Sequence, residues 1–587
     1  MALLTPVVAA VLGYVLWRLA RWTTKPQSAL SRVAGPPRES WLKGNVQNLF
    51  RDALEYNLRL SREYGTAVRM YSLYGQEALY ISDPLALQHV FGKDQQAYDV
   101  NDAFITSNLL MFGEGLIGTL GDQHKKQRKM LNPVFSVSNM RDLLPVIQPI
   151  ADQMAAIFTQ QIPGDGAVTE IDVMPWLSRG AQEYISQACF GYTFNALDLN
   201  KRNEYSEAAR RYTPAALKLS HLRPFLPFIV RTFPLALRKK MVEWYPREAM
   251  KDFVYILTTM HETSKRIFER KKRALGGEGG QAQGEKEEGD LGPLMQGKDI
   301  MSILLKANAS SDEADRLTDD ELIGQMSTLL FAGFETTTYA ISRILWLLAS
   351  RQDAQARLRS EIRAAKQAYL AEGRSPAEAW EDVSLSYDDL MALPYLDALL
   401  RETLRVYPPS SVHFRVAKED TTLPLQYPVR AVDGSSVSVV PLEKGTQLLI
   451  SIIASNHNKD VWGEDASEWK PERWMTASAE SEDKDNAAVK SSVRYPGAYS
   501  SILTFLGGPR GCIGFKFSEM EAKQVLATLL PRLHFALPSA TNADGRKKEI
   551  YWKMSGPQIP VVQPPFGDGM SPQVPLDVRR VETEDFA

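Results

Sequence analysis

Cysteine is scarce in this sequence of 587 residues, which contains only Cys189 and Cys512. Two cysteines cannot supply the set of disulfides that stabilises small secreted domains, and a CxxC zinc site is excluded. Any chemistry that a thiol performs in this protein must therefore be performed by one cysteine acting alone.

An excess of charge of either sign is also missing. Lys and Arg together number 68 and Asp and Glu 70, which gives a formal net charge of −2. Proteins that bind nucleic acid usually carry a basic surface, so no nucleic-acid partner is expected. A hydrophobic content of 44% excludes wholesale disorder and predicts a folded protein.

Several catalytic and cofactor-binding motifs are absent. The sequence contains no HExxH zinc motif, no GxSxG nucleophile motif and no GxGxxG dinucleotide motif. Residues 292–298 resemble a phosphate-binding loop, but Asp299 stands where that motif requires Ser or Thr. We therefore expect no flavin-binding or nucleotide-binding domain within this chain.

An uncharged apolar run lies at the N-terminus. It covers Ala2–Trp17 and is followed by the basic residues Arg18 and Arg21. A cleaved signal peptide carries its basic residues before the apolar run, and here they follow it. This order favours an uncleaved anchor with the rest of the chain in the cytosol. We therefore predict a transmembrane anchor over residues 1–22 and a basic, proline-rich hinge over residues 23–41.

The rest of the chain shows mainly helical patterns of apolar residues. We expect one large domain over residues 42–564, interrupted by polar insertions at about residues 276–297 and 477–492, and a polar, frayed tail over residues 565–587. Short β-strands are predicted near Val68–Ser72, Ala78–Ile81, Val437–Val440 and Gln447–Ile452. These features indicate a mainly α fold with small β-sheets.

One long helix is predicted in the second half of the chain. Thr318 and Glu321 form a capping box, and no proline follows until after Ala349. About 30 helical residues give a rod of roughly 45 Å, long enough to cross a domain. At its centre Gly333, Glu335 and neighbouring threonines interrupt the apolar pattern. Threonine hydroxyls can bond to the preceding turn and bend a helix there.

The most specific pattern surrounds Cys512, in the string FLGGPRGCIG from Phe505 to Gly514. Its glycines permit tight turns and close approach of the backbone to a flat ligand, and a helical pattern follows. Backbone N–H groups at a helix N-terminus, together with Arg510, would stabilise a thiolate that ligates a metal or acts as a nucleophile. Cys189 lies in an apolar run and is interpreted as a buried hydrophobic residue.

Three further motifs accompany this loop: HKKQR at residues 124–128, ETLR at residues 402–405 and PERW at residues 471–474. Together the four motifs resemble the cytochrome P-450 family of haem-thiolate monooxygenases, in particular its membrane-anchored microsomal type and fungal members. The resemblance covers about residues 35–560. It implies the cytochrome P-450 fold, a single large haem domain behind an N-terminal membrane anchor, with haem b as cofactor and Cys512 as the iron ligand.

The resemblance also implies which side chains hold the haem. Cationic and hydrogen-bonding groups are expected at its two carboxylates, and loop residues beside the cysteine are expected to line it. These cofactor-binding residues are Cys512, Arg510, His124, Arg128, Arg415, Phe505 and Gly514. Many members of the family carry Trp where this chain has His124, and either ring offers an N–H donor.

The ETLR motif places Glu402 and Arg405 three residues apart, so that they share one helix face and can pair. The resemblance implies a network of this pair with Arg473 that braces the loop carrying the cysteine. Such a network supports insertion of the cofactor and takes no part in the chemistry.

Glu335 and Thr336 are the expected catalytic residues, because they would carry protons to dioxygen bound at the haem. The implied reaction inserts one oxygen atom from O2 into an apolar small molecule. Electrons are expected from a separate NADPH-cytochrome reductase, with a small electron-carrier haem protein as a further candidate donor. The implied location is the endoplasmic reticulum membrane, with a single span and a cytosolic catalytic domain.

Two other haem-thiolate activities are alternatives to monooxygenation. One is an isomerase or peroxide-rearranging enzyme that takes no external electrons, and the other is a non-catalytic haem sensor. The adjacent Glu335 and Thr336 favour monooxygenation, because only that reaction requires protons to be delivered to bound oxygen.

The substrate is expected to meet an apolar wall formed by residues between Ala103 and Leu116 and by the long helix around Phe331 and Phe334. Residues 221–235 are apolar, broken by prolines and mildly basic. We expect this stretch to make a second contact with the membrane, beside the access channel for the substrate.

Overall fold

The structure is a computed structural model that describes residues 28–475 and 493–582, apart from residues 47, 52, 202, 246, 276–297, 500, 542, 543, 555 and 556, together with residues 13 and 585. Both predicted insertions, at residues 276–297 and 477–492, lie outside the described residues, as does the predicted anchor over residues 1–22 except for residue 13. Among the helices of the described part, none is both long and apolar enough to cross a membrane.

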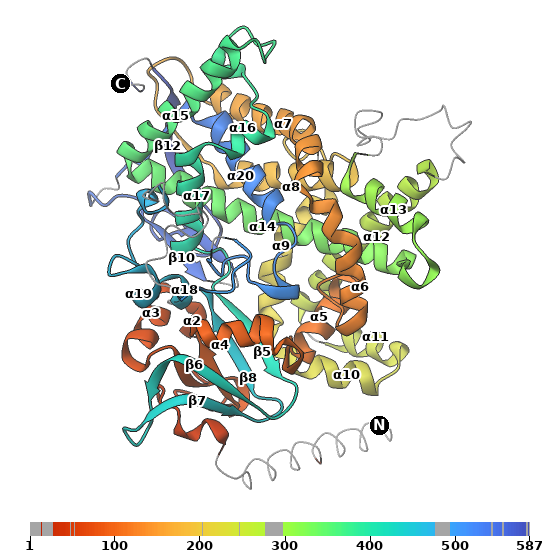
Figure 1. The fold of residues 1–587 in the computed structure, drawn as a ribbon. Helices are drawn as coiled ribbons and strands as arrows, with labels where there is room; N and C mark the ends of the chain where they lie inside the picture. Colours follow the sequence, from red (N-terminus) through yellow and green to blue (C-terminus); the bar gives the residue numbers. More distant parts are fainter. Residues whose placement is uncertain are drawn as a thin grey trace.

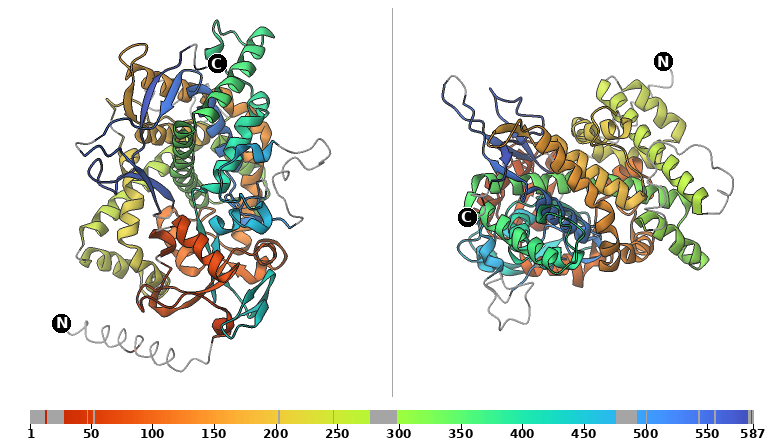
Figure 2. Two further views of the ribbon diagram at one scale, coloured as in Figure 1. Left: turned by 90° about the vertical axis from the view of Figure 1, so that its left-hand side faces the viewer. Right: turned by 90° about the horizontal axis from the view of Figure 1, so that it is seen from above.

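Helices make up most of the protein, which confirms the predicted mainly α fold (Figure 1). The helices are α2 (Asn48–Arg51), α3 (Ala53–Tyr64), α4 (Pro84–Gln88), α5 (Asp102–Phe112), α6 (Gly121–Leu131), α7 (Val137–Gln160), α8 (Met174–Phe190), α9 (Glu204–Lys218), α10 (Leu226–Thr232), α11 (Leu235–Trp244), α12 (Glu248–Leu275), α13 (Ile300–Ser310), α14 (Asp319–Ser350), α15 (Gln352–Ala371), α16 (Tyr387–Met391), α17 (Pro394–Val406), α18 (Ile452–Asn456), α19 (Lys459–Trp462) and α20 (Phe515–Leu529). Figures 1 and 2 show α14 in the interior of the helical part, where it contacts α8, α12 and α20.

Within the described residues, the strands form four small sheets rather than one large layer. They are β1 (Ala67–Tyr71), β2 (Glu77–Ile81), β3 (Tyr98–Asp99), β4 (Thr169–Asp172), β5 (Val412–Ala417), β6 (Thr421–Arg430), β7 (Ser436–Leu442), β8 (Gln447–Ser451), β9 (Leu533–Ala536), β10 (Ile550–Met554), β11 (Gln558–Val562) and β12 (Pro575–Arg580). The largest sheet has the order β1-β2-β8-β5-β3, and the others are β6-β7, β10-β11 and β4-β12-β9. The four strands predicted from the sequence correspond to β1, β2, β7 and β8 and are confirmed.

Helix α14 confirms the predicted long helix and its start. The Thr318 side chain accepts a hydrogen bond from the Glu321 N–H, and the Glu321 carboxylate accepts one from the Thr318 N–H. The helix has 32 residues, which corresponds to a length of about 48 Å. The helix is continuous through its centre, so Thr336, Thr337 and Thr338 lie on unbroken helical backbone.

The two ends of the predicted domain differ from the sequence-based boundaries. Leu30 and Val33 are buried, and the Arg69 N–H donates to the Ala34 carbonyl at 3.0 Å, so the hinge expected over residues 23–41 is packed on β1 in its second half. A Cβ at Gly35 would lie 1.9 Å from the Arg69 carbonyl oxygen, which explains the glycine there. The domain therefore begins before residue 42.

The C-terminal tail was predicted to be polar and frayed, and this is wrong for residues 575–580. These residues form β12, which lies between β4 and β9 and is mostly buried. The charged residues of this segment suggested an exposed tail. Asp577 is nevertheless buried, and its carboxylate accepts a hydrogen bond from the Ser539 N–H at 2.9 Å.

Candidate active site

The loop before α20 holds Cys512 in a tightly folded backbone. The Cys512 N–H donates to the Phe505 carbonyl at 2.8 Å, and the Gly511 N–H donates to the Gly508 carbonyl at 2.9 Å. Gly508 has φ +67°, and a Cβ there would lie 2.1 Å from the Phe91 carbonyl oxygen. Only glycine fits this position, and a Cβ at Gly507 would likewise lie 1.6 Å from the Pro496 carbonyl oxygen, so these two glycines serve the close packing of the loop.

The thiol of Cys512 is accessible to solvent, yet protein surrounds it closely enough that burial raises its pKa. The Gly514 N–H and the positive charge of Arg128 oppose this effect and lower the pKa of the thiol. The sequence predicted Arg510 as the cation beside the sulfur, but Arg128 takes that role and also donates to the Gly511 carbonyl at 2.5 Å. A bound metal ion removes a thiol proton outright, so this setting suits a metal-bound thiolate.

Four basic side chains predicted for the cofactor lie together in front of this loop. His124 and Arg128 come from α6, Arg415 from β5 and Arg510 from the cysteine loop. Burial and the charges of Arg510 and Arg128 lower the pKa of His124 to about 3. Burial and Arg510 lower the pKa of Arg415 to about 10. The positive charges of these side chains therefore act on their neighbours in the cluster.

This basic cluster has fewer acids than cations. Within the described part of the chain, its recorded ion pair joins Arg510 to Asp99 at 3.4 Å. Three arginines beside one carboxylate favour a bound group with further negative charge. At Gly514, two residues after the cysteine, no protein atom outside the two chain neighbours lies within 4 Å of the place that a Cβ would occupy, so the loop also has open space there. A flat, dianionic haem fits these residues.

The predicted catalytic residues lie on an accessible face in the middle of α14. Ala332 and Thr336 are exposed, one turn apart, in a helix that is otherwise largely buried. The Thr336 hydroxyl donates to the Ala332 carbonyl at 2.9 Å. The neighbouring Thr337 hydroxyl lies 3.2 Å from the Ser518 hydroxyl in the first turn of α20. This contact brings the centre of α14 next to the helix that begins after Cys512.

An aromatic cluster lies beside the same part of α14. The rings of Phe331 and Phe112 are stacked at 4.5 Å, and the ring of Tyr212 meets Phe331 edge-on at 4.9 Å. The structure thus brings together Phe331 and α5 as predicted, whereas Phe334 is buried in the core. Tyr212, from α9, was not identified from the sequence, because nothing local distinguishes it from a core residue of an amphipathic helix.

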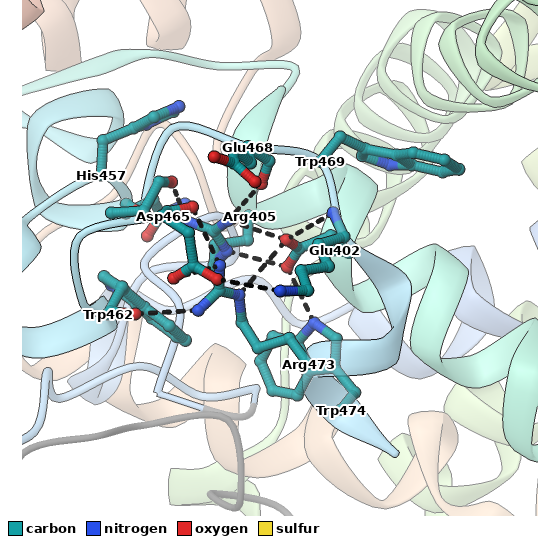
Figure 3. Close-up of polar contacts among 12 residues, drawn as sticks. Glu402, Arg405, His457, Trp462, Asp465, Glu468, Trp469, Arg473 and Trp474 are labelled. Atoms are coloured by element: carbon teal, nitrogen blue, oxygen red, sulfur yellow. Dashed lines mark hydrogen bonds and ion pairs between the residues drawn. The ribbon is translucent and has the colours of Figure 1, made fainter. Parts of the chain in front are cut away.

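Glu402 and Arg405 form the buried pair predicted from the ETLR motif (Figure 3). Both side chains are fully buried, and the guanidinium donates to the two carboxylate oxygens at 2.8 Å each. Arg473 joins the carboxylate at 3.4 Å and donates to the Trp462 carbonyl at 2.8 Å. The Trp474 ring N–H donates to Glu402 at 2.9 Å. The predicted contact of this pair with Arg473 is present.

The same network reaches the cysteine loop through Asn456, a residue that the sequence did not single out. Arg405 donates to the Asn456 carbonyl at 2.7 Å. The Asn456 side chain accepts from the Leu503 N–H at 2.9 Å and donates to the Thr504 hydroxyl at 3.1 Å. Thr504 immediately precedes Phe505, so the buried ion pair is connected by hydrogen bonds to the start of the loop.

A mainly helical fold with a glycine-rich cysteine loop facing a basic cluster defines a haem-thiolate protein. The family model described as cytochrome P-450 matches residues 34–559, and the chain belongs to that family. This finding confirms the family and the fold that the sequence motifs indicated.

The chain is similar over nearly its whole length to several fungal proteins. Cytochrome P-450 monooxygenase 91 of Postia placenta is 39% identical over 571 residues, which cover 97% of each chain. A protein named ganoderic acid synthetase, from Ganoderma lucidum, is 35% identical over 582 residues and 98% of each chain. The protein is therefore a haem-thiolate monooxygenase that contains iron protoporphyrin IX and uses O2, a redox partner and a small-molecule substrate.

Proposed function

We propose that Cys512 is the iron ligand and that the basic cluster of His124, Arg128, Arg415 and Arg510 holds the two carboxylates of the haem. The observation that carries this proposal is an accessible thiol whose pKa the charge of Arg128 lowers, in a loop that has open space at Gly514. Phe505 lines the cofactor beside the sulfur. When bound, the haem supplies the binding and activation of dioxygen, which a thiolate ligand favours by donating electron density.

Thr336 and Glu335 hold and transfer protons on the accessible face of α14. The Thr336 hydroxyl gives its hydrogen to the Ala332 carbonyl, so the lone pairs of its Oγ1 are free to accept a hydrogen bond from a water molecule. A water fixed at this oxygen can pass a proton toward the reacting dioxygen, and Glu335 can replace it from the adjacent position. Reconstitution with a reductase and labelled dioxygen tests the proposal, because it predicts that label enters the product.

The Thr336→Ala variant is expected to keep its haem but to lose coupling between electron use and product formation. Without the hydroxyl, the water is no longer held, and electrons leave as hydrogen peroxide. We expect the product formed per NADPH to fall by about tenfold or more. The matched control is Thr338→Ala. The Thr338 hydroxyl is buried and makes the equivalent hydrogen bond, donating to the carbonyl of Phe334 in the preceding turn at 2.8 Å. Equal coupling in both variants would contradict the role of Thr336.

The electron donor in this proposal is a separate NADPH-cytochrome reductase, with a small electron-carrier haem protein as a further donor. The docking of such a donor is supported by the outer face of α6, where Lys125 is exposed and Lys126 is half-buried. Arg128, on the same helix, contacts the cysteine loop directly. A donor with an acidic surface that docks here would lie close to the thiolate side of the haem.

We further propose that the protein is held in the endoplasmic reticulum membrane by a single span over residues 1–22, with the catalytic domain in the cytosol. A second contact is supported by the short 3-10 helix η6 (Ser220–Phe225) and by α10 and α11. Phe225 is 46% exposed, Phe228 40% and Leu235 60%, and Arg231 lies among them. Exposed aromatic residues next to basic ones suit the interface of an anionic membrane.

A variant that lacks residues 1–27 is expected to retain membrane affinity through this second contact. The cut keeps Leu30 and Val33, which are part of the core. Adding Phe225→Ser and Phe228→Ser should lower binding to anionic vesicles by about tenfold or more, because the substitutions remove two apolar rings that would be buried in the membrane. Val168→Ser, at an exposed valine beside β4, is the control and should have no effect. If the truncated protein does not bind vesicles, the second membrane contact is contradicted.

A further inference from the structure

Gln127, on α6, lies at the centre of a buried hydrogen-bond network between α6 and the start of α14. Its side chain is fully buried. The amide donates to the Glu321 carboxylate at 3.0 Å and to the Glu114 carbonyl at 2.7 Å. Its oxygen accepts a hydrogen bond from the Thr119 hydroxyl at 2.9 Å. Both donor hydrogens of the amide are therefore used, and its acceptor is engaged as well.

Glu321 joins this network to the helix that carries Thr336. Its carboxylate accepts a hydrogen bond from the Thr318 N–H at 2.8 Å in the capping box of α14, and the same carboxylate accepts from Gln127. Only 4% of Glu321 is exposed. A charged acceptor makes a stronger hydrogen bond than a neutral one, so this contact fixes α6 against the first turn of α14.

The loop over residues 113–120, between α5 and α6, is packed on the same part of α14. The Leu116 N–H donates to the Gln325 side chain at 2.9 Å. A Cβ at Gly115 would lie 2.2 Å from the Gly324 carbonyl oxygen, and a Cβ at Gly324 would lie 2.4 Å from the Gly115 nitrogen. Two backbones that approach so closely leave the loop no room to shift. The loop and the first turns of α14 therefore form one packed unit.

Thr119, near the end of this loop, contacts a residue of the basic cluster. Its carbonyl accepts a hydrogen bond from Nη2 of Arg510 at 2.9 Å, while its hydroxyl donates to Gln127. A single buried residue thus connects Gln127 to the guanidinium in the cysteine loop. On α6, Gln127 also lies between His124 and Arg128 in the sequence. It therefore fixes the spacing between the basic side chains of α6 and that of the cysteine loop.

We propose that Gln127 is a positioning residue for the haem carboxylates: it holds α6 on Glu321 and, through Thr119, holds Arg510 where a carboxylate of the haem binds. The ion pair of Arg510 with Asp99 is longer, at 3.4 Å, than its bond to Thr119. A guanidinium that is fixed in advance loses little conformational freedom when it binds a carboxylate, so the haem is held more tightly. Because Arg510 binds the haem only in the function proposed above, this role of Gln127 rests on that proposal.

Gln127→Met tests this role, because methionine has a similar length and cannot replace the amide donors. The start of α14 should survive, since the Glu321 carboxylate still accepts from the Thr318 N–H. The full-length, haem-loaded variant in detergent is expected to lose haem to excess apomyoglobin about tenfold or more faster than the unchanged protein. The midpoint potential of the haem should also fall, because a cation that is held less firmly stabilises the added electron less.

An exchange of the two side chains provides a rescue. Gln127→Glu alone places a second carboxylate against Glu321 in a buried site and should also release haem faster than the unchanged protein. Adding Glu321→Gln restores a donor opposite an acceptor and keeps an acceptor for the Thr119 hydroxyl, and a capping box takes Gln as well as Glu. The double variant should therefore release haem about threefold or more slowly than Gln127→Glu.

Two controls separate positioning from general stability. Gln355, on α15, is also fully buried, and its amide donates to the Leu348 and Phe535 carbonyls at 2.9 and 2.8 Å. Gln355→Met should lower the unfolding temperature, yet leave the potential and the rate of haem release unchanged well below that temperature. Arg510→Gln should release haem faster and lower the potential, as Gln127→Met does.

The outcomes separate the role of Gln127 from the proposed function. If Gln127→Met changes neither haem release nor potential while Arg510→Gln changes both, the role of Gln127 is overturned and the proposed function stands. The role is also overturned if Gln355→Met has the same effects as Gln127→Met, or if the double variant releases haem as fast as Gln127→Glu. If Arg510→Gln itself changes neither quantity, the proposed binding of a haem carboxylate by Arg510 fails, and the role of Gln127 fails with it.

Discussion

Replacing Cys512 with serine is expected to abolish the red-shifted Soret band of the reduced carbon monoxide complex and to lower product formation by more than about a hundredfold. The reason is that a serine oxygen donates less electron density than a thiolate. The loop itself should survive, because its backbone bonds from Cys512 to Phe505 and from Gly511 to Gly508 do not involve the side chain. Absorption spectra of the purified variant, with its haem content, provide the measurement.

The other cysteine offers the matched control for this experiment. Cys189 is fully buried in the core on α8, and burial raises the pKa of its thiol well above the usual range. Cys189→Ala should retain the red-shifted band and the activity, at a modest cost in stability. A red-shifted band that persists in Cys512→Ser would show that the iron ligand has been assigned wrongly.

Replacing Glu402 with glutamine is expected to destabilise the protein by about 3–5 kcal/mol, because it removes the counter-charge of buried Arg405 and leaves Arg473 with Asp465 as its carboxylate partner. Arg405 and Arg473 both donate to this carboxylate, and neither side chain is more than 3% exposed. The hydrogen bonds through Asn456 then lose their anchor, so we expect less haem per protein after purification. Thermal unfolding and the ratio of Soret to protein absorbance measure both effects.

A second glutamate in the same region controls for the loss of charge alone. Glu472, on the 3-10 helix η10 (Pro471–Trp474), pairs with Arg357 at 2.8 Å, and both side chains are more than 40% exposed. Glu472→Gln should change stability by less than about 1 kcal/mol, as is typical of a surface ion pair. Similar effects of the two substitutions would argue against the bracing role of Glu402.

The parts of the site that could be predicted from sequence are those in which neighbouring residues determine the structure. The start of α14 follows from its capping box, and the cysteine loop follows from glycines that only a close backbone approach explains. The pair of Glu402 and Arg405 follows from helix geometry. In the capping box and the ion pair the interacting residues lie within a few positions of one another, and in the loop the glycines themselves indicate the close approach of distant backbone.

The parts that sequence reasoning missed depend on contacts between distant segments. Asn456 carries no local pattern, yet it links Arg405 to residues 503 and 504. Tyr212 joins the apolar wall only because α9 meets α5 and α14 in the folded protein. The effect of burial on the Cys512 thiol is similar, because it depends on the whole surrounding fold.

Strand β12 also has a consequence for how the protein is made. Its register pairs Pro575 with Asp172, so β4 leaves the ribosome about 400 residues before its only partner strand in the described sheet. At a synthesis rate of about 5–20 residues per second, β4 waits for roughly 20–80 s with an open edge, which is the kind of surface on which nascent chains aggregate. Added chaperones during expression should therefore raise the yield of intact protein.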